Sequence, residues 1–78
     1  MFEAVQKKIA EEFNIETGSI TLKSHLRNDL EIDSMAAVNL SFELEGEFDI
    51  KISDDELAGL QTVSDIVTLL ESKGAVVK

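Results

Sequence analysis

The segment RNDLEIDSMAAVNL, Arg27 to Leu40, holds the residues best suited to chemistry. Three carboxylates alternate through it at Asp29, Glu31 and Asp33, and Ser34 follows directly. An acid-rich loop that ends in a hydroxyl allows three kinds of chemistry: nucleophilic catalysis by the serine, binding of a divalent cation by the carboxylates, or covalent attachment of a group to the serine. Each makes different demands on the rest of the sequence.

The sequence lacks the partner groups that catalysis by Ser34 would need. A serine nucleophile needs an adjacent base and a third group that orients the base, and His25 is the single histidine. Paired carboxylates are abundant, but we expect a chain of 78 residues to form no water-excluding cleft in which their pKa values could be driven apart. The sequence therefore predicts a protein that is not an enzyme.

The carboxylate spacing matches a calcium-binding loop only at its start. Such a loop takes ligands at positions 1, 3 and 5, glycine at position 6 and a bidentate glutamate at position 12. Counted from Asp29, position 6 is Ser34 and position 12 is Leu40. We expect no resident metal, although loose binding of divalent ions by the acidic side chains stays open.

Two interpretations of Ser34 remain. Asp33 or Ser34 can cap a helix that starts here, because either side chain can accept a hydrogen bond from the N–H groups of the first turn. An exposed serine at a helix N-terminus can also carry a phosphodiester, which the positive end of the helix dipole favours and the neighbouring carboxylates oppose. The residues alone favour the cap.

Hydrophobic spacing predicts the helices that position this segment. Near the N-terminus, apolar residues at helical intervals predict a helix that ends near Asn14: Phe2, Val5, Ile9 and Phe13. Residues 14–32 show no helical spacing of apolar residues, so we expect a long loop here. Aliphatic side chains scattered along this loop should attach it to the core, and a short helical turn is expected around 24–28. A second long helix is expected from the Asp33–Ser34 cap to Phe48.

The second long helix has a wide apolar arc that includes Met35, Val38 and Phe42, with Ser41 and Glu45 as poor fits inside it. Residues 50–52 are expected to form an extended loop.

The C-terminal part of the sequence predicts two more helices. Ser53 can cap a short helix over 54–58, and Thr62 can cap a last helix that stops at Gly74. The predicted fold class is therefore all-α, a small bundle of three principal helices and one short helix with a long first loop, in a single domain over 1–78.

Composition and charge limit the partners. The net charge is −9, and ten of the sixteen acidic residues lie between Asp29 and Glu56 with Lys51 as the only base there. This excludes the clustered cations of a nucleic-acid-binding surface, and it predicts either a docking surface for basic partners or a solvated face. With no apolar stretch long enough to span a membrane and no signal peptide, the chain is expected to be soluble and cytoplasmic, and we also expect a monomer. The lack of cysteine excludes a disulfide framework and a thiolate metal site.

The run DLEIDSM at 29–35 is followed by VNL at 38–40, ELEGEF at 43–48, ISDDE at 52–56 and Thr62-Val63. With these motifs in this order, the chain resembles an acyl carrier protein over nearly its whole length. The expected order of helices and the acidic middle agree with it. The sequence departs from the family at Glu31, where glycine is usual, at Asn39, at Gly46, and at Ser53, where proline is common.

The resemblance implies a function and a cofactor. A phosphopantetheinyl transferase would esterify Ser34 with 4′-phosphopantetheine from coenzyme A, recognising the flanking Asp33 and Met35. The thiol of this arm would carry acyl groups as thioesters to partner enzymes of fatty-acid biosynthesis, or of a specialised polyketide, lipid or aminoacyl pathway. A non-carrier acidic interaction module, in which Ser34 only caps a helix, is the alternative.

The resemblance also implies two further sets of residues. Acidic side chains would bind basic patches on synthases, reductases and acyltransferases: Asp29, Glu31, Glu43, Glu47, Asp54, Asp55 and Glu56. Apolar side chains are candidates for the core and for a cleft that takes the acyl chain: Val38, Phe42, Leu44, Leu57, Leu60, Ile66 and Leu70.

Overall fold

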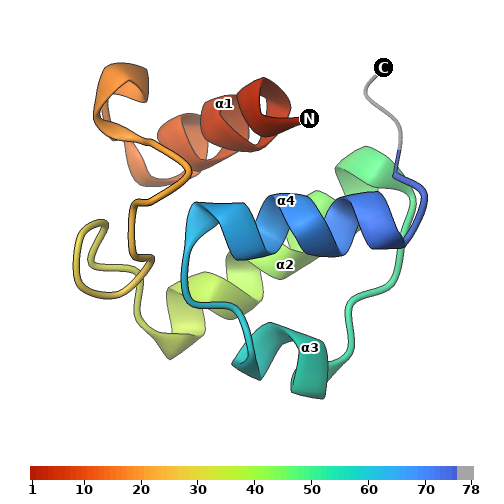
Figure 1. Ribbon diagram of the computed structural model, residues 1–78. Helices are drawn as coiled ribbons and strands as arrows, with labels where there is room; N and C mark the ends of the chain where they lie inside the picture. Colours follow the sequence, from red (N-terminus) through yellow and green to blue (C-terminus); the bar gives the residue numbers. More distant parts are fainter. Residues whose placement is uncertain (76–78) are drawn as a thin grey trace.

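The computed structural model describes residues 1–75 and confirms the all-α prediction (Figure 1). The fold has three principal helices and one short helix, and a long first loop connects the first helix to the second; this loop contains a single 3-10 turn, η1. The bounds are α1 Phe2–Phe13, η1 Thr17–Ser19, α2 Ser34–Phe48, α3 Asp54–Ala58 and α4 Val63–Ser72. Helix α1 packs against α4 and α2, and α3 packs against α2 (Figure 1).

Helix α1 ends where the sequence predicts. Asn14 caps it in the left-handed conformation, with φ 55°, and donates its backbone N–H to the Ala10 carbonyl. Val5 and Ile9 are completely buried. They meet the inner face of α4, whose Val63, Ile66 and Leu70 are also completely buried, and these apolar faces form the centre of the core.

Helix α2 buries only part of its apolar arc. Leu40, Leu44 and Phe48 face the core, whereas three apolar residues predicted for the inner side are exposed by 79% (Met35), 38% (Val38) and 63% (Phe42). The width of this arc predicts packing against more than one neighbour, and α2 contacts both α1 and α3. Val38 borders the space between α2 and α3, whereas Met35 and Phe42 are largely exposed, so the expectation of Phe42 in the core is wrong.

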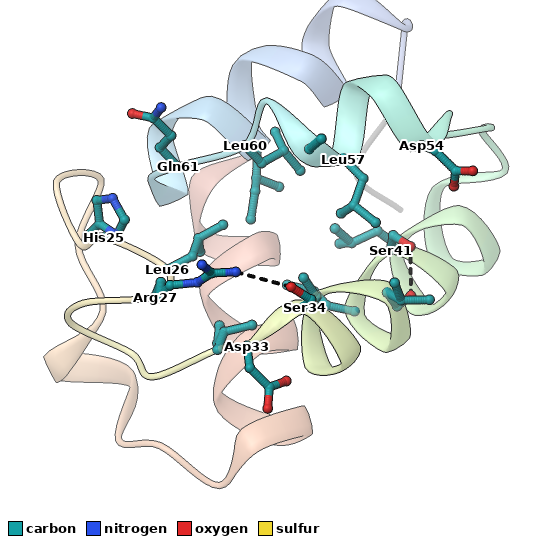
Figure 2. Close-up of a pocket in the computed structure, with 17 residues that line it drawn as sticks. His25, Leu26, Arg27, Asp33, Ser34, Ser41, Asp54, Leu57, Leu60 and Gln61 are labelled. Atoms are coloured by element: carbon teal, nitrogen blue, oxygen red, sulfur yellow. Dashed lines mark hydrogen bonds between the residues drawn. The ribbon is translucent and has the colours of Figure 1, made fainter.

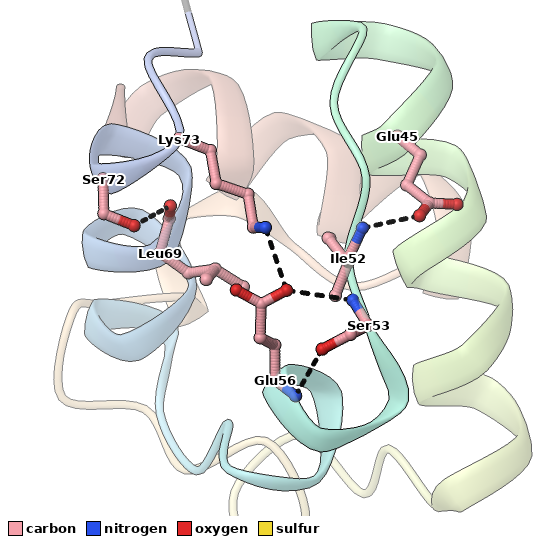
Figure 3. Close-up of polar contacts among 7 residues, drawn as sticks. All are labelled: Glu45, Ile52, Ser53, Glu56, Leu69, Ser72 and Lys73. Atoms are coloured by element: carbon pink, nitrogen blue, oxygen red, sulfur yellow. Dashed lines mark hydrogen bonds and ion pairs between the residues drawn. The ribbon is translucent and has the colours of Figure 1, made fainter.

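The two polar residues in the apolar arc of α2, Ser41 and Glu45, each make a hydrogen bond with a backbone group. The Ser41 hydroxyl donates to the Val38 carbonyl at 2.7 Å within the same helix. The Glu45 carboxylate accepts the backbone N–H of Ile52 at 2.7 Å (Figure 3). Residues 50–52 form a loop rather than a strand, as predicted. Because this loop has no ladder of hydrogen bonds, the Glu45 carboxylate supplies the acceptor for the Ile52 N–H.

Two capping boxes fix the C-terminal helices. In α3 the Ser53 hydroxyl accepts the Glu56 N–H while the Glu56 carboxylate accepts the Ser53 N–H. Thr62 and Asp65 make the same exchange at α4. The predicted caps Ser53 and Thr62 are therefore confirmed.

The long first loop is attached to the core, but its local structure differs from the prediction. Residues 26–30 form turns rather than helix, and the helical turn lies earlier, at η1. Ile20, Leu26 and Ile32 are buried and anchor the loop. No helix within residues 1–75 is long and apolar enough to cross a membrane.

The backbone of this loop is bonded to the connection between α3 and α4. The Leu26 N–H donates to the Gln61 carbonyl at 2.8 Å, and the Val63 N–H donates to the Ser24 carbonyl at 3.1 Å. His25 and Thr62 form an isolated antiparallel bridge between these two bonds. The loop that precedes Ser34 is thereby held beside the start of α4.

Candidate functional site

Ser34 is the first residue of α2, and its hydroxyl takes no part in the helix cap. Asp33 caps the helix by accepting the Ala36 N–H at 2.8 Å. Ser34 is exposed, and its Oγ accepts a hydrogen bond from the guanidinium of Arg27 at 3.1 Å (Figure 2). Of the two cap residues that the sequence allows, the structure uses Asp33 and leaves the serine hydroxyl accessible.

The other carboxylates of the loop bond to backbone or point into solvent. The Asp29 carboxylate accepts the His25 N–H at 2.7 Å, and the His25 ring nitrogen Nδ1 accepts the Asn28 N–H at 3.2 Å. Among residues 1–75, no group of three or more histidine, cysteine or acidic side chains is placed to hold a metal ion.

Glu31 has a backbone conformation that suits glycine. Its φ is 56°, in the left-handed region that costs a residue with a Cβ about 1 to 2 kcal/mol. This explains why an acyl-carrier-like loop favours glycine here: the turn between the buried Leu26 and Ile32 requires a positive φ at this point.

Replacing Glu31 by glycine is expected to stabilise the fold by about 0.5 to 1 kcal/mol, since relief of the strain exceeds the entropic cost of glycine. The measurement is urea unfolding of wild type and variant. Glu31→Gln is the matched control, because it removes the charge but keeps the strained backbone. If Glu31→Gln stabilised the protein as much as Glu31→Gly, charge rather than conformation would be the cause.

A half-open cavity of about 590 Å³ lies beside Ser34, between α2, α3 and the start of α4 (Figure 2). Its wall is mainly aliphatic, and Arg27, Asp33 and Ser34 line it at one end. Five of the seven predicted cleft residues line it: Val38, Leu44, Leu57, Leu60 and Ile66. The remaining two do not, because Phe42 faces solvent and Leu70 is buried in the core.

Most of the predicted partner-binding acids are exposed, but two of them form ion pairs within the described part of the chain. Six are exposed and Glu56 is half-buried; the six are Asp29, Glu31, Glu43, Glu47, Asp54 and Asp55. Glu43 pairs with Lys8 at 3.2 Å, and its hydrogen bond raises the pKa of the Lys8 ammonium. Glu56 pairs with Lys73 at 2.9 Å (Figure 3).

The pKa of Glu56 is lowered, first by the Ser53 N–H of the capping box and then by Lys73. A lowered pKa in the folded state contributes stability that is present above the ordinary pKa of 4.5 and is lost as the pH falls through the folded value. We expect Glu56→Gln to flatten the acid-side decline in the free energy of unfolding between about pH 5 and about pH 3.

Urea unfolding across this pH range measures that slope. Lys73→Gln should flatten it less, because the Ser53 N–H still holds the carboxylate. A Glu56→Gln variant with the wild-type slope would contradict this assignment.

Two features of the site were not predicted from the sequence. The first is an exposed ridge of α2, made of Met35, Val38 and Phe42, which starts next to Ser34. Its spacing at i, i+3 and i+7 was visible, but the pattern alone does not show whether a neighbouring element covers it. The second is the hydrogen bond from Arg27 to Ser34. The sequence feature that could have indicated it is that Arg27 is the only Lys or Arg between Lys23 and Lys51.

Comparisons with known proteins agree with this geometry. Residues 3–70 match the family described as phosphopantetheine attachment site. The chain is 39% identical over 69 residues to an acyl carrier protein of Exiguobacterium sibiricum, across 88% of this chain and 87% of the relative.

Two solved structures are also similar. A protein of Mycobacterium tuberculosis assigned as an acyl carrier protein superposes with a TM-score of 0.85 at 34% identity, over 92% of this chain and 97% of that one. The acyl carrier protein from Enterococcus faecalis superposes with a TM-score of 0.77 at 32% identity, over 92% of this chain and 91% of that one. The chain therefore belongs to the acyl carrier protein family, and its cofactor is 4′-phosphopantetheine.

Proposed function

We propose that Ser34 is the residue that carries the phosphopantetheine arm. The observation that supports this most directly is an exposed hydroxyl at the mouth of an apolar cavity, left free by the neighbouring cap at Asp33. In the transfer from coenzyme A, Ser34 Oγ bonds to the phosphorus, the pyrophosphate bond breaks and 3′,5′-ADP leaves. The hydroxyl proton passes to a base of the transferase. Asp33 and Met35 flank the serine as part of the surface that the transferase recognises.

The carrier function needs a thiol that this chain does not itself contain. The sequence has no cysteine, so the terminal thiol of the arm is the group that forms acyl thioesters. The acyl-transferring reactions then belong to partner synthases, reductases and acyltransferases, and this chain is a carrier rather than an enzyme. We place it in fatty-acid or a related acyl biosynthesis in the cytoplasm, as a monomer.

The cavity beside Ser34 is the proposed site for the acyl chain. Its volume of about 590 Å³ lies within the range of ordinary ligand pockets. The side chains of Leu44, Leu57 and Ile66 give it the apolar wall that a hydrocarbon chain needs.

Partner enzymes would bind the exposed ridge of α2 and the acids around it. An apolar ridge next to the attachment point gives contact area, while Glu47, Asp54 and Asp55 give charge that basic patches complement. Exposed ion pairs contribute only about 0.2 to 1 kcal/mol each, which suits a carrier that must leave each enzyme quickly. Glu43 and Glu56 would first have to exchange Lys8 and Lys73 for partner residues.

Mass spectrometry tests the attachment. The unmodified protein is incubated with coenzyme A, Mg²⁺ and a transferase of broad specificity, and one phosphopantetheine mass should be added per chain. Proteolytic fragments should place that mass on the peptide that contains Ser34. A wild-type chain that gains no mass, or a mass located on another serine, would contradict the proposal.

A further inference from the structure

Arg27 is a cation in an acidic segment, yet it pairs with a neutral hydroxyl. It is the only Lys or Arg between Lys23 and Lys51. Its guanidinium donates to Ser34 Oγ at 3.1 Å. The ion pairs among residues 1–75 join Lys8 to Glu43 and Lys73 to Glu56, so Arg27 has no carboxylate partner within the described part of the chain.

Two of the three carboxylates that follow Arg27 in the loop are bonded to backbone N–H groups. The Asp29 carboxylate accepts the His25 N–H and the Asp33 carboxylate accepts the Ala36 N–H. Figure 2 shows Asp33 turned away from the Arg27–Ser34 contact. A guanidinium can form two parallel hydrogen bonds with the oxygens of a phosphate and gains the attraction of opposite charges, neither of which a single neutral hydroxyl offers. Arg27 is therefore placed beside an atom that becomes part of an anion when the arm is attached.

We propose that Arg27 is a positioning residue for the phosphodiester of the arm. This inference rests on the proposed attachment at Ser34. The non-bridging phosphate oxygens are two bonds from Oγ, so a guanidinium that already contacts Oγ reaches them by a rotation of its own side chain. The contact offsets the repulsion between the phosphate and the carboxylates of Glu31 and Asp33.

The contact also directs the arm. Arg27 and Ser34 both line the cavity, at the same end (Figure 2). A phosphodiester held by both residues keeps the start of the arm at the cavity mouth. Arginine suits this role better than lysine, because its planar fork of donors fixes the orientation of the phosphate as well as its charge.

A thermodynamic cycle tests the proposal. The melting temperature is measured with and without the arm, for wild type and for Arg27→Gln, after mass spectrometry has confirmed loading of each. The change in melting temperature on loading should be more favourable in wild type by about 2 to 5 °C. Arg27→Lys should restore part of that difference. Lys23→Gln is the matched control, since it removes the same charge from the same exposed loop without touching the cavity.

Phosphorus NMR of the loaded protein gives a second readout. The ³¹P resonance of the phosphodiester should move in Arg27→Gln and stay in place in Lys23→Gln. In the wild-type protein, the side-chain N–H resonances of Arg27 should shift when phosphopantetheine is attached. This measurement does not require that any variant can be loaded.

The outcomes separate the two proposals. If wild type gains no mass, the attachment at Ser34 and the role of Arg27 both fail. If wild type gains the mass at Ser34 but its Arg27 resonances do not shift, the attachment stands and the role of Arg27 is overturned. An equal change in melting temperature on loading in wild type and Arg27→Gln would overturn it as well.

Discussion

Replacing Ser34 by alanine is expected to abolish the gain of mass with coenzyme A and transferase, while the free energy of unfolding stays within about 0.5 kcal/mol of wild type. The loss is complete because no other group of the site offers a hydroxyl at the start of α2. Stability is kept because Asp33 caps the helix. The Ser34→Ala variant loses only the exposed hydrogen bond from Arg27, and alanine has a high helix propensity, so the cost in stability is small.

Asp33→Ala is the contrasting variant. It removes the acceptor of the Ala36 N–H, so it should cost about 0.5 to 2 kcal/mol in urea unfolding. The two neighbours thus separate the cap from the attachment point. A Ser34→Ala variant that lost as much stability as Asp33→Ala would return Ser34 to a capping role and favour a non-carrier interaction module.

Replacing Leu44 by alanine is expected to be the most destabilising single change considered, at about 2 to 5 kcal/mol. Leu44 is 1% exposed and belongs both to the core and to the cavity wall. Its truncation removes buried apolar surface and enlarges a cavity that is already open at one side. For a chain of this size the total stability is about 4 to 12 kcal/mol, so the variant would be close to unfolding at elevated temperature.

Val38→Ala is the control for that prediction. Val38 lines the same cavity from the same helix but is 38% exposed, so its truncation should cost less than about 1 kcal/mol. Urea unfolding of both variants, with the m-value checked for constancy, measures the difference. Equal losses for Leu44→Ala and Val38→Ala would show that burial does not set the cost at this wall.

Local signals in the sequence predicted the elements and their caps. The helical period of Val5 and Ile9 fixed α1, and Asn14 ended it. Ser53 and Thr62 predicted the starts of α3 and α4 because a capping box needs only residues three apart. These features depend on contacts within one turn of chain, which sequence patterns describe well.

Long-range contacts could not be predicted in the same way. The apolar arc of α2 was visible, but whether another helix covers Phe42 depends on how distant segments pack. The same is true of Glu45, whose bond to Ile52 requires the chain to pass beside α2 after Asp49. The direction of Arg27 toward Ser34 depends on a loop held in place by the buried Leu26 and Ile32.

The bonds between the first loop and the start of α4 are all made by main-chain atoms: Leu26 to Gln61, Val63 to Ser24, and Ser64 to Leu22. Main-chain bonds do not depend on which side chains the residues carry. The side chain of Gln61, which lines the cavity beside these bonds, can therefore be replaced while the main-chain bonds remain. If the cavity takes the acyl chain as proposed, substitutions at its rim would change which chain fits while the main-chain bonds keep Ser34 in place.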